Sequence, residues 1–168
     1  MYRPRRQGFT LIELLVVIAI IGLLAGVVIA SMNAARQKAR IATAKASIRE
    51  IRSAIEILVN DTFLWPGHKT AEQIESGGGN EIWNLNPSSA GLTATDGLYP
   101  GWRGPYMGTV PLDPWGNPYF FDTDYAVDAS GNPCQSTCTN AVAVGSFGPN
   151  GVGQNVYDSD DIILIMKR

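Results

Sequence analysis

The sequence has few of the side chains that carry most enzyme chemistry. Its 168 residues include one histidine and two cysteines, and neither the nucleophile motif G-x-S-x-G nor the zinc motif H-E-x-x-H occurs. The lone histidine, His68, lies in a segment with loop composition. No pair of carboxylates has a spacing that singles it out for glycoside hydrolysis. We therefore expect no catalytic activity and assign no catalytic residue.

Basic residues are scarce in the C-terminal part of the chain. Residues 61–168 contain four basic and twelve acidic side chains, a net charge of −8. A nucleic-acid backbone requires a basic face, so we do not expect this part to bind nucleic acid. An acidic surface is compatible instead with a bound cation.

Charge is missing altogether from a long N-terminal run. Leu14 to Met32 comprises nineteen residues without an ionisable side chain. A helix of that length spans about 28 Å, close to a bilayer core of roughly 30 Å, which predicts a membrane-spanning helix. Arginines precede the run and place the N-terminus in the cytoplasm. A secretory signal peptide would have a shorter apolar core, whereas an uncleaved signal anchor has the same hydropathy and stays open.

Glu13 is a single carboxylate at the start of this run. A charge inside the bilayer is costly and usually functional, although on position alone headgroup depth explains Glu13 equally well. Its context is a basic segment, Gly8, the residues FTLIE and then the apolar run. This order resembles the type IV prepilin class III signal. The resemblance implies that residues 1–8 are a leader, that prepilin peptidase cuts between Gly8 and Phe9, and that the new Phe9 amine is methylated.

The same resemblance gives Glu13 a role in assembly. Filament formation would bury the cationic amine of Phe9 among the packed helices. A buried charge needs a partner in a medium of low dielectric constant. Glu13, one helical turn along, would pair with its own amine or with that of a neighbouring subunit, and so favour one axial register.

The helical pattern continues beyond the apolar run. No proline interrupts residues 9–60, and apolar side chains after Asn33 recur at spacings of three and four. The members of this stripe are Ile41, Ala44, Ile48, Ile51, Ile55 and Leu58. We predict one long helix, with residues 9–32 as its membrane-spanning, filament-core half and residues 33–60 as an amphipathic half that packs on a folded domain.

Residues 61–168 are predicted to form that globular domain. The pattern indicates a short helix from Thr70 to Ser76 and three strands, Pro118 to Phe121, Ala141 to Phe147 and Ile162 to Met166. A small antiparallel sheet laid against the long helix would bury the apolar stripe. The expected fold class is therefore α+β and pilin-like.

A second resemblance rests on the block RGPYMGTVPLDPWGNPYFF, residues 103–121. It is similar to a block of the major pseudopilins of type II secretion systems that leads through a turn into the first strand. Asp113, Gly116 and Asn117 are typical turn residues, so we interpret the block as structural. Residues 68–100 resemble no segment of that family.

Residues 144–162, VGSFGPNGVGQNVYDSDDI, resemble the calcium loop of the same family. The implied oxygen ligands are the carbonyl of Phe147 and side chains among Asn150, Asp158, Asp160 and Asp161. Asn150 stands where the family often has aspartate, which removes a charge and should weaken the site. A solvated acidic turn is the alternative interpretation.

Asp122, Asp124 and Asp128 form a rival group of acids. They do not make an EF-hand loop, because Val127 occupies the position where that loop needs glycine. We therefore expect a polar hairpin at this place.

Cys134 and Cys138 lie on the side of the membrane that we place outside the cytoplasm. An oxidising compartment favours a disulfide between them. Two cysteines without histidines nearby make a poor zinc site.

Together the resemblances imply a structural subunit of a type II secretion pseudopilus, a helical filament that drives protein export. The expected partners are further copies of the chain, prepilin peptidase, minor pseudopilins or pilins, and an inner-membrane assembly platform with its ATPase. We expect a single-pass protein of the bacterial inner membrane with its globular domain periplasmic or extracellular, and calcium as its cofactor. A type IV pilin of a surface pilus, used in adhesion, motility or DNA uptake, is the alternative.

Overall fold

The computed structural model describes residues 8–76 and 81–167. Its elements in chain order are the helices α1 (Leu11–Thr62) and α2 (Ala71–Ser76), a 3-10 turn η1 (Ser88–Ala90), and the strands β1 (Phe120–Val127), β2 (Thr139–Ser146) and β3 (Ile162–Lys167). The chain divides into two compact units, Met1–Ala39 and Arg40–Arg168, so α1 contributes to both. This division falls inside the predicted amphipathic segment 33–60. The predicted leader, apart from Gly8, lies outside the described residues.

The C-terminal part of α1 buries the predicted apolar stripe. Ala44, Ile48, Ile51, Ile55 and Leu58 are each no more than 1% exposed, and Ile41 packs at the border of the same core. Their spacing of three and four residues places them on one helical face. The sequence pattern therefore predicted this face correctly.

The end of α1 is closed by local hydrogen bonds. The Thr62 hydroxyl donates to the Leu58 carbonyl at 2.7 Å. Phe63 adopts a left-handed conformation with φ of 57°, and its N–H donates to the Val59 carbonyl at 2.8 Å. Such a residue stops a helix by satisfying one of its last carbonyls.

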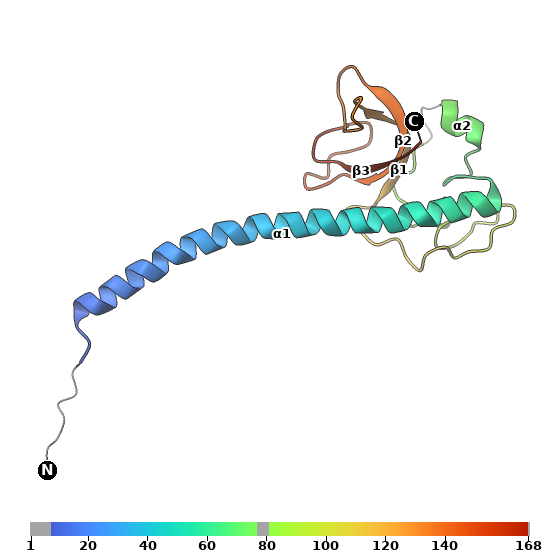
Figure 1. Cartoon of the computed structure of the whole chain (residues 1–168). Helices are drawn as coiled ribbons and strands as arrows, with labels where there is room; N and C mark the ends of the chain where they lie inside the picture. The colour runs from blue at the N-terminus through green and yellow to red at the C-terminus, as the bar shows by residue number, and fades with distance from the viewer. Residues whose placement is uncertain (1–7, 77–80, 168) are drawn as a thin grey trace, which may run out of the picture. The chain divides into compact units, whose positions relative to one another are not determined.

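The three strands form one antiparallel sheet in the order β1-β2-β3, which lies beside the C-terminal part of α1 (Figure 1). One face of the sheet, with Phe121 and Val144, shares a core with α1. The other face carries a second core around Phe120 and Tyr125, which Phe147 from the loop after β2 completes. The α+β prediction is confirmed.

The first strand is longer than predicted. The sequence suggested that Pro118–Phe121 is a strand and that a polar hairpin follows, but β1 runs from Phe120 to Val127. Asp122 is fully buried within it. A shift in the pairing register between Asp122 and Tyr125 explains the error, because a bulge breaks the alternation by which a strand is recognised in sequence.

The turn that leads into β1 is organised by Asp113. Its Oδ1 accepts hydrogen bonds from the N–H groups of Trp115 at 3.0 Å and Asn117 at 2.8 Å. Its Oδ2 accepts the hydroxyl of Ser146, on β2, at 2.6 Å. Gly116 has φ of 96°, a conformation that favours glycine. These contacts agree with the structural interpretation of this block.

Candidate functional site

The start of α1 holds the predicted processing and assembly residues. Gly8, Phe9 and Thr10 precede the helix in non-helical chain. The Thr10 N–H and hydroxyl both donate to Glu13 Oε2 at 2.8 Å, and the Glu13 N–H lies 3.3 Å from the Thr10 hydroxyl that accepts it. This reciprocal arrangement is a capping box, which satisfies N–H groups that a helix otherwise leaves unpaired at its start.

The capping box is a contact of Glu13 that the sequence interpretation overlooked. The signal was present, because TLIE has the form Thr-x-x-Glu that defines such a box. A carboxylate here also lies at the positive end of the helix dipole. Pairing of Glu13 with the Phe9 amine stays a prediction, since the chain described here is uncut.

After the capping box, α1 presents apolar side chains on all sides. The large apolar side chains from Leu11 to Met32 are 48% to 88% exposed. A helix of this kind needs lipid or protein around it. One segment of α1 is long and apolar enough to cross a membrane.

The predicted calcium loop, between β2 and β3, folds back on itself. Asn150 Nδ2 donates to Asp158 Oδ2 at 2.8 Å, and the Asp160 N–H donates to Asp158 Oδ1 at 2.8 Å. Gly148, with φ of +63°, lies so close to the Asp160 carbonyl that an added Cβ would overlap it. The two arms of the loop are therefore in contact, and both oxygens of Asp158 accept hydrogen bonds.

Asp161 is the buried aspartate of this loop, with 8% exposure. The Tyr125 hydroxyl donates to its Oδ2, whereas its Oδ1 is buried without a hydrogen-bond partner. Burial raises the pKa of the Asp161 carboxyl to about 6. An unsatisfied buried oxygen of this kind fits a cation ligand. The Phe147 side chain is buried in the second core, so calcium would use its backbone carbonyl.

A separate acidic group lies at the outer edge of β1. Glu81, Asp122 and Asp124 each offer a carboxylate oxygen within 4.8 Å of the others, and no other such group of acidic, histidine or cysteine side chains occurs in the described part of the chain. Asp128 does not join them, because it accepts the N–H and side-chain amide of Asn132 at 2.9 and 3.1 Å in the hairpin turn. Burial raises the pKa of the Asp122 carboxyl to about 7. The sequence did not indicate Glu81, which is remote from β1 along the chain.

A disulfide closes a short loop in the β1–β2 hairpin. It joins Cys134 and Cys138, whose Cα atoms are 5.8 Å apart. The Cys134 N–H also donates to the Ala126 carbonyl at 3.1 Å, which ties the loop to β1.

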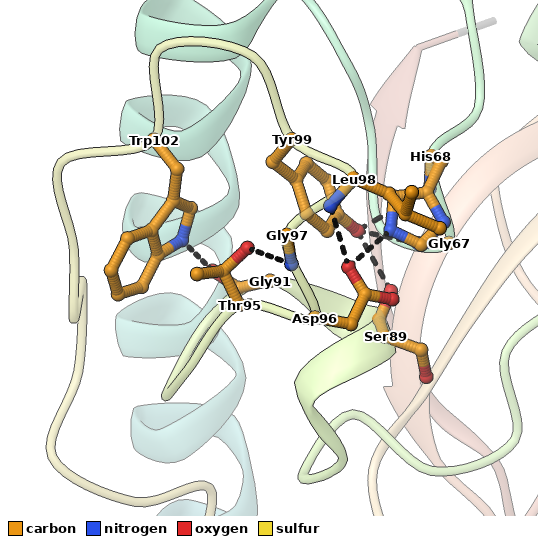
Figure 2. A network of polar contacts seen from close by, with 10 residues as sticks. All are labelled: Gly67, His68, Ser89, Gly91, Thr95, Asp96, Gly97, Leu98, Tyr99 and Trp102. Carbon is orange, nitrogen blue, oxygen red and sulfur yellow. Dashed lines mark hydrogen bonds and ion pairs between the residues drawn. The ribbon is translucent and has the colours of Figure 1, made fainter.

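The segment after α1 is held by a polar network around Tyr99, which Figure 2 shows. The Tyr99 hydroxyl donates to the Ser89 carbonyl at 2.8 Å and accepts the Gly67 N–H at 2.9 Å. The His68 ring lies 4.3 Å from the Tyr99 ring, and its Nε2 contacts Asp96 Oδ1 at 3.0 Å. The lone histidine therefore helps to fasten a loop.

Comparison with known proteins agrees with these features. Residues 3–29 match a family described as the prokaryotic N-terminal methylation motif. That motif, at the start of a long helix that packs on a small antiparallel sheet, defines a pilin-like protein.

Two relatives identify the family to which this pilin-like protein belongs. The type II secretion system core protein G of Pseudomonas aeruginosa is 33% identical over 119 residues, 71% of this chain and 75% of that protein. The core protein G of Klebsiella pneumoniae is 30% identical over 158 residues, 94% of this chain and 93% of its own. This chain belongs to the family of type II secretion system core protein G. Its membership favours a component of a secretion system over a pilin of a surface pilus.

One solved structure is also similar. The crystal structure of the major pseudopilin from the type 2 secretion system of enterohaemorrhagic Escherichia coli has 22% sequence identity and a TM-score of 0.45. The similarity covers 77% of this chain and 90% of that one.

Proposed function

We propose that this chain acts as the major, non-catalytic subunit of a type II secretion pseudopilus. A prepilin peptidase cuts the precursor between Gly8 and Phe9 and methylates the new amine. The inner membrane holds the subunit through α1, with its N-terminus in the cytoplasm and the unit Arg40–Arg168 in the periplasm. Together with minor pseudopilins and an assembly platform, copies of the chain polymerise into a filament that drives protein export.

One structural observation supports this proposal in addition to family membership. The first half of α1 has a continuous exposed apolar surface from Leu11 to Met32, and its only acidic residue, Glu13, lies at the very start. A bilayer and a bundle of identical helices can each cover such a surface, so the same segment serves as anchor and as filament core.

The test separates two roles of Glu13, capping of α1 and pairing with the Phe9 amine. Glu13→Gln keeps an acceptor for the capping box but removes the charge. Thr10→Ala removes the cap and keeps the charge. Fibre yield is measured after co-expression with the peptidase and the assembly platform, and membrane insertion is measured by fractionation.

We expect Glu13→Gln and Glu13→Ala to insert normally and to lower the fibre yield more than tenfold, because a buried unpaired amine costs several kcal/mol. Thr10→Ala should lose less, since a helix cap is worth about 1 kcal/mol. A normal fibre yield from Glu13→Ala would refute the pairing role.

Processing has its own measurement. The intact mass of the mature chain should correspond to Phe9 as the first residue, carrying one added methyl group. A mass that still contains residues 1–8 would contradict the proposed cut.

We also propose that the loop 147–161 binds calcium. The buried, unpartnered Oδ1 of Asp161 supports this proposal, as does the close approach of Gly148 to the Asp160 carbonyl, which brings the two arms of the loop into contact. The ion would draw on Asp158, Asp160 and Asp161 as hard oxygen ligands. Asn150 would add a neutral oxygen.

The calcium proposal is tested by thermal unfolding of the full-length chain in detergent micelles. Tryptophan fluorescence reports only the unit Arg40–Arg168, because all four tryptophans lie in it. Calcium at 100 times its dissociation constant should raise the midpoint by about 5–10 °C relative to chelator. Asp158→Ala/Asp160→Ala, hereafter the loop variant, should lose part of this rise. An unchanged rise in the loop variant would contradict calcium binding at this loop.

A further inference from the structure

The acids at the edge of β1 are brought together by backbone pairing. Ile82 and Phe121 form an antiparallel bridge, in which the Ile82 N–H donates to the Phe121 carbonyl at 2.7 Å and the Phe121 N–H donates to the Ile82 carbonyl at 2.8 Å. The preceding residue, Glu81, therefore faces the following residue, Asp122. Like charges directly opposite each other on paired strands repel, so this juxtaposition favours a cation between the two carboxylates.

A bulge in β1 adds the third acid. Asp122 pairs with Ala143 and Tyr125 with Ala141, so three steps along β1 match two along β2. One extra residue lies between them, and Asp124 belongs to this bulge. Its N–H donates to Asp122 Oδ1 at 2.9 Å, which turns the backbone around the Asp122 carboxylate. Bulges of this kind redirect a side chain and occur often next to functional sites.

Two carboxylate oxygens of this cluster are buried without a hydrogen-bond donor. Asp122 is 0% exposed, yet its Oδ2 has no hydrogen-bond partner. Oδ1 of Asp124 is likewise buried and unpartnered. A buried ionised oxygen without donors costs several kcal/mol, and two of them belong to one cluster.

We propose that Glu81, Asp122 and Asp124 form a binding site for a hard divalent cation, distinct from the loop 147–161. Their ligand oxygens lie within 4.8 Å of one another, about twice the Ca–O distance of roughly 2.4 Å, so one ion can contact all three. The ion supplies the positive charge that the two unpartnered oxygens lack. Bound between Glu81 and Asp122, the ion also offsets the repulsion between their carboxylates.

The donor set defines the class of cation. Three carboxylates offer only oxygen, which suits calcium, magnesium or manganese and disfavours metals that prefer nitrogen or sulfur. Calcium accepts irregular oxygen cages, whereas magnesium sheds its water reluctantly. The fully buried Asp122 therefore favours calcium, and calcium is the probe for the test.

The experiment uses the loop variant as its starting protein, so that calcium binding at the loop 147–161 does not contribute to the signal. Calcium binding to the full-length chain in detergent micelles is measured by titration calorimetry. The loop variant is compared with the same protein carrying Asp122→Asn or, as a matched control, Asp128→Asn. Asp128 is an acid of the same hairpin whose carboxylate is already satisfied by N–H donors in its turn.

We expect the loop variant to bind one calcium ion per chain. Adding Asp122→Asn should abolish this binding, and adding Asp128→Asn should leave it unchanged. The proposal is overturned if the loop variant binds no calcium, or if binding survives Asp122→Asn. The calcium-loop proposal is tested separately, by comparing the calcium binding of the wild type with that of the loop variant.

Thermal unfolding distinguishes loss of the binding site from loss of the fold in the Asp122→Asn variant. In chelator, Asp122→Asn should unfold at the same temperature as its parent or higher, because it removes an uncompensated buried charge and keeps the shape of the side chain. Calcium should then fail to raise its midpoint. A midpoint below that of the parent in chelator would show that the carboxylate is already stabilised within the protein and would refute the site.

Discussion

The contact between Gly148 and the Asp160 carbonyl makes Gly148→Ala a sharp test of the loop geometry. Two separate costs arise. The left-handed backbone at Gly148, φ +63°, costs an alanine about 1–2 kcal/mol. The new Cβ would also lie 2.8 Å from the Asp160 carbonyl carbon and closer still to its oxygen, and relief of such an overlap typically costs about 1–3 kcal/mol.

Gly116→Ala is the matched control. Gly116 also has a positive φ, 96°, but nothing lies within 4 Å of an added Cβ. It therefore carries only the conformational cost, about 1–2 kcal/mol. The difference between the two variants isolates the overlap between the two arms of the loop.

The assay is thermal unfolding of the full-length chain in micelles, followed by tryptophan fluorescence. At about 3 °C per kcal/mol for a unit of this size, Gly148→Ala should melt about 3–9 °C below Gly116→Ala. If the loop binds calcium, Gly148→Ala should also weaken the calcium response while Gly116→Ala keeps it. Equal midpoints for the two variants would show that the arms of the loop do not touch, and would refute the geometry on which the calcium argument depends.

Two further predictions concern the stability of the same unit. Ile55→Ala should lower the free energy of unfolding by about 2–5 kcal/mol, because Ile55 is 0% exposed, whereas Ile57→Ala should lose far less because Ile57 is 50% exposed; chemical denaturation distinguishes them, and similar losses would contradict the assigned buried face of α1. Replacing both Cys134 and Cys138 by serine should cost at most about 2 kcal/mol, since the disulfide closes a very short loop. A loss above about 4 kcal/mol would mean that the disulfide organises more than its own loop.

The features that the sequence predicted are those with local, periodic causes. The buried face of α1 follows from apolar residues such as Ile48, Ile51 and Ile55 at helical spacing, a pattern that survives any detail of packing. The turn around Asp113 and Gly116 follows from residue types that favour turns by themselves. Neither feature depends on contacts between distant parts of the chain.

The features that the sequence missed depend on long-range pairing or on broken periodicity. The full length of β1 was hidden because its bulge interrupts alternation and because a buried Asp122 resembles a loop residue in sequence. Glu81 joins Asp122 only through the bridge between Ile82 and Phe121, which no local pattern encodes. The network around Tyr99 likewise assembles segments that are remote in sequence.

The capping box is a different case, because its signal is short and local. Glu13 is both a charge next to an apolar segment and an ordinary hydrogen-bond acceptor for Thr10. The two roles are compatible, because only Oε2 of Glu13 accepts the hydrogen bonds from Thr10.

The position of this cap has a consequence for the peptide bond between Gly8 and Phe9. A helix that began one turn earlier would enclose this bond in its hydrogen-bonded coil. Because Thr10 and Glu13 fix the first turn at Leu11, Gly8 and Phe9 stay in irregular chain, the kind of backbone at which proteolysis concentrates. The four residues TLIE thus mark the boundary at which irregular, accessible chain ends and the hydrogen-bonded helix begins.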